Sequence, residues 1–529
     1  MNTPEILRFC VEKGFLLDKE VLNIFNETSD IESIKLIMEK IRDTTHQRII
    51  TKNLFNQNKE KVFQIFSALP KENQQNLEGL KIKLGLSIEI SQEFSKESQI
   101  KEEQDEQFCD KVKIFASMPQ VIKKLEVNDF TKYFRNRFHE MRKILLDNSS
   151  LKNLVSINKI SETKQGISVI GIVSDKSVTK NKNILLEVED LTGKIRILIS
   201  QSNQKLYEKA EEICLDSVLG FSGFGNREII FANEIAFPDA MLPERKKSPI
   251  DESVLFLGDL HFGSKLFLEK SFLKFIDYLN GKGPNASEAE KIKYLFLVGD
   301  VIAGVGTYPT QERDLKIKDI EEQFIGLSQF LSKIRKDIKI IISPGNHDGV
   351  RLMEPQPILN ERYAWSIHNL KNVLLTENPA YVNIGGTKNF SGFDILTYHG
   401  FSYPYYANTI SRLIREDALN TPDKIMIYLL KHRHLAPSHS SVQYFPSEED
   451  NLIIKKVPDI FISGHIHKSA ISYYNNILIV SVSSWEGKTP YQEKMGNDPD
   501  FCKVPMFNLK SRTIKILDFE EQDETKNSS

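Results

Sequence analysis

Apolar positions repeat with different periods in successive parts of this 529-residue chain, and each period predicts a different kind of domain. In the first part, apolar side chains such as Ile6, Leu7 and Cys10 recur every three to four positions, which is typical of amphipathic helices. We therefore predict an N-terminal helical domain over residues 1–90, with a role in packing or docking. The sequence of this region gives no indication of chemistry.

Residues 91–128 lack a sustained apolar period, and their first part, SQEFSKESQIKEEQDEQ, is polar and charged. Such a composition buries too little apolar surface to offset the entropy of ordering the chain. We predict a flexible charged linker in this range.

A helical period returns in DFTKYFRNRFHEMRKILLDN, which starts at Asp129. Its aromatic residues share one face of the predicted helix: Phe130, Tyr133, Phe134 and Phe138. Its basic residues are Arg135, Arg137, Arg142 and Lys143. These side chains could contact phosphates, or they could be the solvated residues of an ordinary amphipathic helix.

From about residue 154 to 240 the period becomes two, which is typical of half-buried strands. Strands are expected in GISVIGIVS, on both sides of a turn at residues 190–193, and in SVLGFSGFGNREIIFANEI, with one helix-like stretch between them. This pattern predicts a small barrel of the OB type, so that residues 129–248 form a helix followed by an OB-fold barrel. Such a barrel could grip single-stranded DNA or dock another subunit.

Residues 249–519 alternate short apolar strands with helical stretches, which predicts an α/β domain. Five of these strands end in glycine with aspartate, asparagine or histidine beside it. Because ligands of α/β sheets bind beyond the carboxyl ends of strands, we expect the chemistry there. The polar residues 520–529 are expected to be a disordered tail.

Composition narrows the class of protein further. Charged residues make up 27% of the chain and the formal net charge is −2, so any nucleic-acid contact must come from local basic patches or from a partner. The four cysteines are scattered and form no CxxC motif, which favours a reducing compartment. No signal peptide and no apolar run near the ~18 residues of a membrane span is visible, so we expect a cytoplasmic protein without membrane contact.

The strand ends carry side chains that suit metal ions. They are Asp259 and His261, Asp300, Asn346 with His347 and Asp348, His399, and the pair His465 and His467. One Gly-Asp dipeptide alone indicates only a turn, but five such ends in one domain favour a metal site. Carboxylate, imidazole and amide ligands without thiolate suit manganese, iron or zinc. Two ions about 3.5–4 Å apart could clamp a phosphate.

The order D-x-H, G-D, G-N-H-[DE], H and G-H-x-H resembles the calcineurin-like metallophosphoesterase superfamily. The resemblance implies a β-sandwich flanked by helices, which holds two metal ions. It implies one ion held by Asp259, His261, Asp300 and His467, and a second held by Asp300, Asn346, His399 and His465. It further implies that His347 acts as a general acid or stabilises the transition state, with Asp348 orienting it.

The stretches beside the expected ligands indicate one particular family within this superfamily. GDVIAGVGTYPTQ, PGNHDGVRLMEPQP, KHRHLAPSHS, VPDIFISGHIHKS and SWEGKTPYQEKMGNDPDFCKVP are similar to the small subunits of archaeal D-family DNA polymerases, over roughly residues 250–510. This resemblance implies a manganese-dependent 3′→5′ proofreading exonuclease that releases nucleoside 5′-monophosphates. It implies as partners a large catalytic polymerase subunit, single-stranded or frayed DNA 3′ ends and, through the complex, the sliding clamp.

Two alternatives remain open at this level. The chain could be an inactive scaffold with the same fold, or a free enzyme such as a repair nuclease or a small-molecule phosphodiesterase. The aromatic segment GFSYPYYAN after His399 is also ambiguous. Its four rings, Phe401, Tyr403, Tyr405 and Tyr406, could stack on an unpaired 3′ end or could pack within a loop.

Overall fold

The structure is a computed structural model in which the chain divides into two units, residues 1–108 and 109–529. It describes residues 8–10, 12, 13, 16–18, 21, 22, 35, 38, 49, 50, 112–115, 124–283, 285–496 and 498–521. In the first unit, β1 (Leu16–Leu17) pairs in parallel with β2 (Ile49–Ile50). The predicted helical domain over residues 1–90 lies largely outside the described residues, as does most of the predicted tail.

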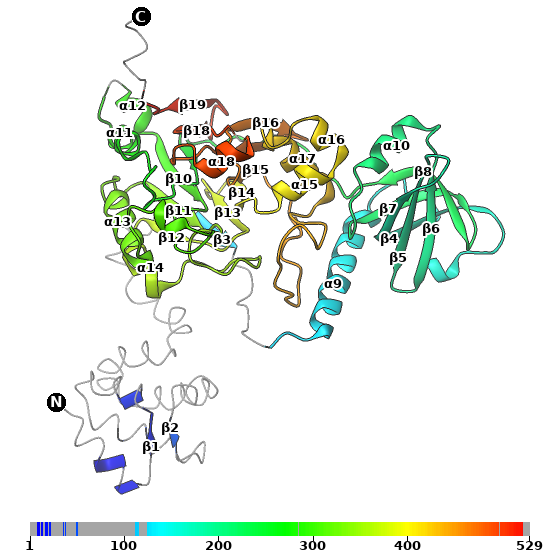
Figure 1. Ribbon diagram of the computed structural model, residues 1–529, viewed down its shortest axis with the longest axis horizontal. Helices are drawn as coiled ribbons and strands as arrows, with labels where there is room; N and C mark the ends of the chain where they lie inside the picture. The colour runs from blue at the N-terminus through cyan, green and yellow to red at the C-terminus, as the bar shows by residue number, and fades with distance from the viewer. Residues whose placement is uncertain are drawn as a thin grey trace, which may run out of the picture. The chain divides into compact units, whose positions relative to one another are not determined.

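Two six-stranded sheets build the larger domain (Figure 1). In spatial order, the first sheet contains β12 (Val373–Leu375), β11 (Lys339–Ser343), β10 (Ile292–Val298), β9 (Ser253–Leu257), β18 (Lys503–Asn508) and β19 (Ile514–Asp518). The second contains β16 (Ala470–Tyr474), β17 (Ile477–Ser481), β15 (Ile460–Ser463), β14 (Phe393–Tyr398), β13 (Ala380–Ile384) and β3 (Val112–Phe115).

The period-two pattern of each strand divides its side chains between two cores. On β9, Val254 and Phe256 join Ile395 and Val480 of the second sheet in one cluster, so this cluster fills the space between the sheets. The alternate residue Leu255 belongs to a cluster on the outer face of the first sheet. Each large apolar side chain buried in this way contributes about 1.5–3 kcal/mol. The predicted sandwich of two layers is therefore present.

Helices cover both outer faces of the sandwich (Figure 1). On the first sheet lie α11 (Glu269–Leu279), α13 (Ile320–Ser332) and α14 (Glu361–His368), with the short α12 (Ala286–Ala289) nearby in the chain. On the second lie α15 (Tyr403–Thr409), α16 (Ser411–Arg415) and α17 (Pro422–His432), and α18 (Pro490–Met495) precedes β18. The α13 helix begins where the Asp319 side chain accepts the N–H of Glu322, a typical N-cap.

A closed five-stranded barrel precedes the sandwich. Its strands are β4 (Gln165–Val178), β5 (Ile184–Asp190), β6 (Gly193–Ile199), β7 (Val218–Gly225) and β8 (Ile229–Ala236), with α10 (Gln204–Glu211) between β6 and β7. The turn expected at residues 190–193 is confirmed, because β5 and β6 pair up to Asp190 and Gly193. None of the described helices combines the length and apolarity that crossing a bilayer requires.

The range expected to be a linker contains a strand. Val112–Phe115 forms β3, which pairs antiparallel with β13 at the edge of the second sheet. Its side chains alternate between half-buried and exposed, so the segment VKIF has the period of an edge strand. The sequence could not reveal it, because its partner strand lies more than 260 positions further along the chain.

The long helix α9 (Val127–Leu146) forms where the helical period predicted it, but one of its basic residues has a different role from contact with phosphates. Arg137 is 2% exposed and donates from Nε to Asp450 at 2.6 Å and from Nη1 to the carbonyl oxygen of Pro437 at 2.7 Å. Arg137 is therefore a buried partner of the sandwich domain and is not available to a phosphate.

The aromatic segment after His399 packs into the core. Tyr403 and Tyr406 are fully buried on α15 and belong to the apolar cluster beneath the second sheet. The alternative that these two rings stack on an unpaired 3′ end is therefore wrong, because neither ring is accessible. Phe401 and Tyr405 are half-buried against the same cluster.

Candidate metal centre

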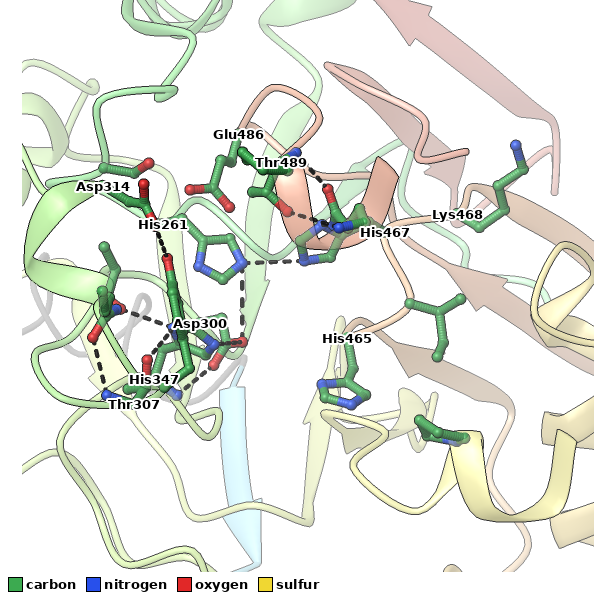
Figure 2. A pocket seen from close by; sticks show the side chains of 18 of the residues that line it. His261, Asp300, Thr307, Asp314, His347, His465, His467, Lys468, Glu486 and Thr489 are labelled. Carbon is green, nitrogen blue, oxygen red and sulfur yellow. Dashed lines mark hydrogen bonds and ion pairs between the residues drawn. The ribbon is translucent and has the colours of Figure 1, made fainter. Parts of the chain in front are cut away.

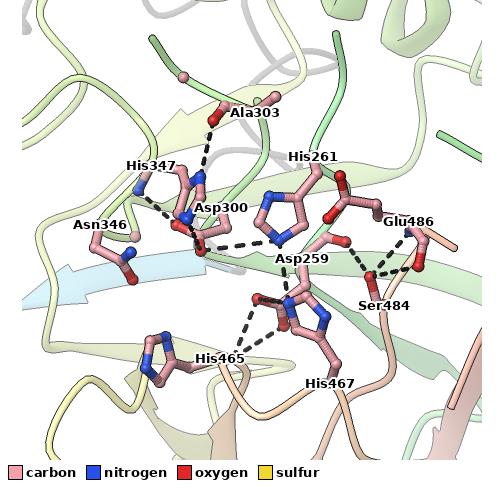
Figure 3. Close-up of polar contacts among 12 residues, drawn as sticks. Asp259, His261, Asp300, Ala303, Asn346, His347, His465, His467, Ser484 and Glu486 are labelled. Atoms are coloured by element: carbon pink, nitrogen blue, oxygen red, sulfur yellow. Dashed lines mark hydrogen bonds and ion pairs between the residues drawn. The ribbon is translucent and has the colours of Figure 1, made fainter. Parts of the chain in front are cut away.

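The expected ligands come from loops that follow five strands. β9, β10 and β11 run parallel in one sheet, and β14 and β15 run parallel in the other. Parallel strands present their carboxyl ends at one edge, so the loops that follow them lie close together. The side chains brought together at this edge include Asp259, His261, Asp300, Asn346, His347, His465 and His467 (Figure 3). His399 lies among them, beside Asp300 and Asn346.

One group of donor atoms consists of Asp259, His261 and His467, whose nearest ligand atoms all lie within 4.8 Å of one another. Nε2 of His467 is 3.1 Å from Nε2 of His261 and 3.5 Å from Oδ1 of Asp259. The other ring nitrogen of His467 lies 2.9 Å from the Gln492 amide, which holds the ring in place. All three side chains are buried.

A second group consists of Asp300, His399 and His465. Nδ1 of His399 lies 3.1 Å from the carbonyl oxygen of Val298, which can only accept, so Nδ1 carries a proton and Nε2 faces the site. That Nε2 is 3.2 Å from Oδ2 of Asp300 and 3.1 Å from Oδ1 of Asn346.

Asp300 links the two groups. Its Oδ2 also lies 4.0 Å from Nε2 of His261 and 3.9 Å from Nε2 of His347, so that the carboxylate stands between these two rings (Figure 3). The position suits a carboxylate that is shared between two ions.

Five of these residues hold left-handed backbone conformations, although none of them is glycine. Their φ angles are 51° for Asp259, 47° for His261, 49° for Asp300, 71° for His465 and 59° for His467. Left-handed conformations cost an L-residue roughly 1–2 kcal/mol. Such strain clusters at functional sites, where the surrounding structure imposes it. The geometry thus supports a functional site independently of the residue types.

Gly464 leaves room for the carboxylate of Asp259. A Cβ atom at this position would lie 2.6 Å from Oδ2 of Asp259 and 2.9 Å from the carbonyl oxygen of Val298. The backbone N–H of His465 donates to both carboxylate oxygens of Asp259, at 3.1 and 3.0 Å. The glycine therefore permits the close approach that brings the GHIH loop to the site.

The electrostatics of the cluster favour a cation beside Asp300. Burial opposes ionisation of this carboxyl, but the charges of His399 and His347 overcome it and hold the pKa of Asp300 well below its usual range. Burial also acts to lower the pKa of His399, yet Asp300 raises it to about 10. A bound cation would compete with that proton for the same carboxylate.

His347 has one ring nitrogen committed to the backbone. Its Nδ1 lies 2.8 Å from the carbonyl oxygen of Ala303, so this nitrogen must carry a proton that it donates (Figure 3). Nε2 is left facing Asp300 and the hollow in front of the site. This orientation suits a group that exchanges a proton with a substrate.

The resemblance implies that Asp348 orients the ring of His347, but in the structure Asp348 does not contact that ring directly. Its two oxygens accept the backbone N–H of Ile302 at 3.0 Å and of Gly345 at 2.8 Å. Asp348 is 2% exposed, and burial together with the charge of Asp300 raises its pKa. It braces the loops after β10 and β11, while the carbonyl of Ala303 holds the imidazole.

Two buried glutamines that the sequence analysis missed fix the loop of Ala303. Nε2 of Gln311 donates to the Ala303 carbonyl at 2.8 Å, and its Oε1 accepts the N–H of Thr307 at 2.9 Å. Gln323 on α13 accepts the N–H of Gly304 at 2.9 Å and donates to its carbonyl at 3.2 Å. Neutral amides carry no charge pattern, so no sequence signal could have identified them.

A hollow of about 840 Å³ opens in front of these groups. His261, Asp300, His347, His465 and His467 line it (Figure 2). Residues 303–314, which we call the 303–314 loop, supply another part of the lining. The volume and the position of the hollow suit a ligand that reaches both donor groups at once.

The donor set fits a pair of divalent ions. Each group offers carboxylate oxygen and imidazole nitrogen, Asn346 adds an amide oxygen beside His399, and no thiolate is among them. This chemistry suits manganese, iron or zinc. The outer nitrogen of His399 donates to the carbonyl oxygen of Val298, as is usual for a histidine that binds metal. The outer nitrogen of His467 is in contact with the side-chain amide nitrogen of Gln492.

The sandwich and its site define a calcineurin-like phosphoesterase domain. Residues 253–469 match the sequence profile of the family described as Calcineurin-like phosphoesterase. The match covers all of the expected ligands and His347. It indicates a hydrolase domain that uses divalent metal ions.

Relatives that match most of the chain identify the family. A DNA polymerase II small subunit of Methanothermobacter thermautotrophicus is 35% identical over 74% of this chain and 80% of its own length. Proteins of the same name are 36% identical in Pyrococcus furiosus, over 74% of this chain and 64% of the relative, and 36% in Archaeoglobus fulgidus, over 74% and 77%. The chain therefore belongs to the DNA polymerase II small subunit family, and the resemblance found in the sequence is confirmed.

Proposed function

We propose that this chain is a metal-dependent 3′→5′ exodeoxyribonuclease that proofreads for a DNA polymerase. One observation carries the proposal. All seven expected ligand side chains and the free Nε2 of His347 meet at one edge of the sandwich, in front of an open hollow. A domain that served only as a scaffold would not need such a set of buried charges and imidazoles.

Asp259, His261, Asp300 and His467 would hold one ion, and Asp300, Asn346, His399 and His465 the other, with manganese as the metal. Bound there, divalent ions supply activation of water and neutralise charge on the phosphate. The chain's own contribution is to fix these donors in a buried and strained frame, so that little reorganisation is needed during the reaction.

The reaction would remove the terminal nucleotide of a single-stranded or frayed 3′ end. A water oxygen bonds to phosphorus while the bond from phosphorus to the bridging 3′ oxygen breaks. His347 gives the proton on Nε2 to the leaving oxygen, and the water proton passes to solvent, from which the imidazole is reprotonated. The hydrogen bond from Nδ1 to Ala303 keeps Nε2 in position for this transfer.

Partners follow from the family. Because its relatives are named as small subunits of DNA polymerase II, we propose that the chain binds a large catalytic polymerase subunit and acts on DNA near that subunit.

We assign the barrel within residues 129–248 to the OB type, because its strand order β4-β5-β6-β8-β7 and the position of α10 match that class.

The test uses the purified full-length chain with manganese and a primer that carries a mismatched 3′ end. The parent should release nucleoside 5′-monophosphates, and the Asp300→Ala and His347→Ala variants should each lose at least about 100-fold in rate. Equal activity in all three proteins would overturn the assignment of the site. Activity that is absent in the parent, together with normal binding of the large subunit, would favour a scaffold.

A further inference from the structure

The 303–314 loop presents an aromatic ring beside His347. Tyr308 is 40% exposed, and its ring centroid lies 6.5 Å from that of His347. The hydroxyl of Tyr308 donates to Oδ2 of Asp314 at 3.0 Å, which anchors the edge of the ring. Both residues line the hollow in front of the donor groups. An exposed aromatic ring that is held in place in this way can stack on a planar ligand.

The bond that is broken in the proposed reaction decides which nucleotide of the DNA lies beside His347 and Tyr308. Release of a nucleoside 5′-monophosphate leaves the bridging 3′ oxygen on the shortened strand. If His347 protonates that oxygen, the nucleotide beside His347 is the penultimate one, which becomes the new 3′ end. The ring of Tyr308 therefore neighbours the sugar and base of the retained strand, and the departing nucleotide lies on the other side of the phosphate.

We propose that the 303–314 loop is the subsite for the penultimate nucleotide and that Tyr308 stacks on its base. This inference rests on the proposed exonuclease function. Stacking on an aromatic ring tolerates every base, because each base has a π face, and a proofreading site requires that tolerance. The subsite would recognise the retained strand without reading its sequence.

The loop is suited to this role because its backbone is already fixed. Gln311 binds Ala303 and Thr307, and Gln323 binds both backbone groups of Gly304. Both glutamines are buried. A loop that is ordered before binding loses less conformational entropy when the ligand arrives, so more of the stacking energy contributes to affinity.

Two substrates with the same transferred group isolate the leaving side. Short oligothymidylate and p-nitrophenyl thymidine 5′-phosphate both transfer a thymidine 5′-phosphoryl group to water, but only the oligonucleotide has a base on its leaving group. For Tyr308→Leu, we expect the ratio of kcat/KM on oligothymidylate to kcat/KM on the nitrophenyl ester to fall roughly 5- to 100-fold, mainly through KM. Tyr308→Phe, which keeps the ring, should restore most of that ratio.

The matched control is Trp365→Leu. Trp365 is also an exposed aromatic residue, 43% exposed, whose ring N–H donates to a carboxylate, that of Glu321. It does not line the hollow, so its loss should leave the ratio at the parent value. An equal fall for Trp365→Leu, or an unchanged ratio for Tyr308→Leu, would overturn the subsite.

A binding measurement provides a readout that does not require turnover. In the His347→Ala background, oligonucleotides with 2-aminopurine at the penultimate or the terminal position report stacking through quenching of their fluorescence. Quenching at the penultimate position should disappear when Tyr308→Leu is added; quenching that persists contradicts the proposal.

If the parent hydrolyses neither substrate, the proposed function fails and the subsite with it. If the parent is active and only the Tyr308 results fail, the exonuclease assignment stands alone.

Discussion

Arg137 and Asp450 form a buried ion pair at 2.6 Å, although 313 positions separate them in the chain. The same carboxylate accepts the hydroxyl of Tyr133 at 2.6 Å and Nε2 of His434 at 2.9 Å. Burial acts against ionisation of Asp450, but its cationic and polar partners lower its pKa. Every member of the network is satisfied, so helix α9 is joined to the phosphoesterase domain by charge as well as by packing.

Removing one partner of this pair should destabilise the fold strongly. Arg137→Met leaves the Asp450 carboxylate buried without its cation, which should lower the free energy of unfolding by about 3–5 kcal/mol. The double variant Arg137→Met/Asp450→Leu should recover a large part of that loss, because no charge is then left unpaired. Urea denaturation followed by the fluorescence of the two tryptophans measures both.

Arg142→Met is the control for this experiment, since Arg142 is exposed on the same helix. Its effect should stay within about 0.5 kcal/mol. An Arg137→Met variant as stable as Arg142→Met would show that the buried pair contributes nothing to stability.

Metal content should follow the two donor groups. After dialysis against manganese and removal of free metal, the parent should retain about two ions per chain. His467→Ala should retain about one, and Asp300→Ala should lose most of both, because its carboxylate lies between the groups. Elemental analysis by mass spectrometry gives these numbers without an activity assay.

His439→Ala serves as the matched histidine control. His439 is 54% exposed and pairs with Asp216, outside the donor groups. Its substitution should leave the metal content at the parent value. Full occupancy in Asp300→Ala would mean that the ions, if any, bind elsewhere.

Gln311 should affect catalysis through the Ala303 carbonyl. Gln311→Met keeps the volume of the side chain but removes both of its hydrogen bonds to the loop, so the acceptor of His347 loses its support. We expect kcat on DNA to fall roughly 10-fold, with manganese content unchanged, because a misplaced proton donor transfers less efficiently.

Gln329→Met provides the comparison, because Gln329 is an exposed residue of α13. It should retain the parent kcat. Hydrolysis of a nitrophenyl ester depends little on a proton donor, so Gln311→Met should be less impaired on that substrate than on DNA. Equal losses on both substrates would indicate a general disturbance of the site.

His432 should make the stability depend on pH. Burial lowers its pKa to about 3 from an ordinary value near 6.5, while Nδ1 donates to the carbonyl of Tyr428. Between these values the unfolded chain binds a proton that the folded chain does not. The contribution of His432 to stability is therefore complete above pH 6.5 and is lost as pH falls toward 3, by about 1.4 kcal/mol per unit.

His432→Phe removes this titration while keeping a ring between Phe237 and Tyr428. The difference in unfolding free energy between parent and variant should shift in favour of the variant as the pH falls from 7 to 5. Urea titrations at three pH values measure it. A difference that stays constant over that range would show that His432 ionises without penalty in the folded state.

Much of the site could be predicted because strand ends have fixed neighbours in a parallel sheet. Apolar runs such as those before Asp259 and Asp300 identify the strands, and parallel pairing brings their ends together. Gln311 and Gln323 could not be predicted in this way. Their function depends on how the 303–314 loop folds back on itself and against α13. Amides that bind the backbone have no recognisable sequence pattern.

The misassigned residues have a common physical cause. The sequence pattern predicts that Arg137 is exposed with the other basic residues of α9 and that Val112–Phe115 is linker. It cannot indicate otherwise, because the partners of both lie hundreds of positions away. Local patterns report which side of an element is apolar. They do not indicate which distant carboxylate forms an ion pair with the element or which distant strand pairs with it.

The left-handed backbone at five residues of the candidate metal centre bears on whether the domain is an enzyme or only a scaffold. His465→Gly and His465→Ala both delete the imidazole, but glycine relaxes a φ of 71° that alanine must keep. The glycine variant should be more stable by about 0.5–1 kcal/mol, the reverse of their order in a helix. Thermal unfolding of the two proteins measures this difference.

A lineage that used the domain only as a scaffold could therefore gain stability by single substitutions at these positions. In this chain aspartate and histidine occupy all five, so the protein forgoes that stability. Such a trade-off is expected where strained side chains are needed for activity.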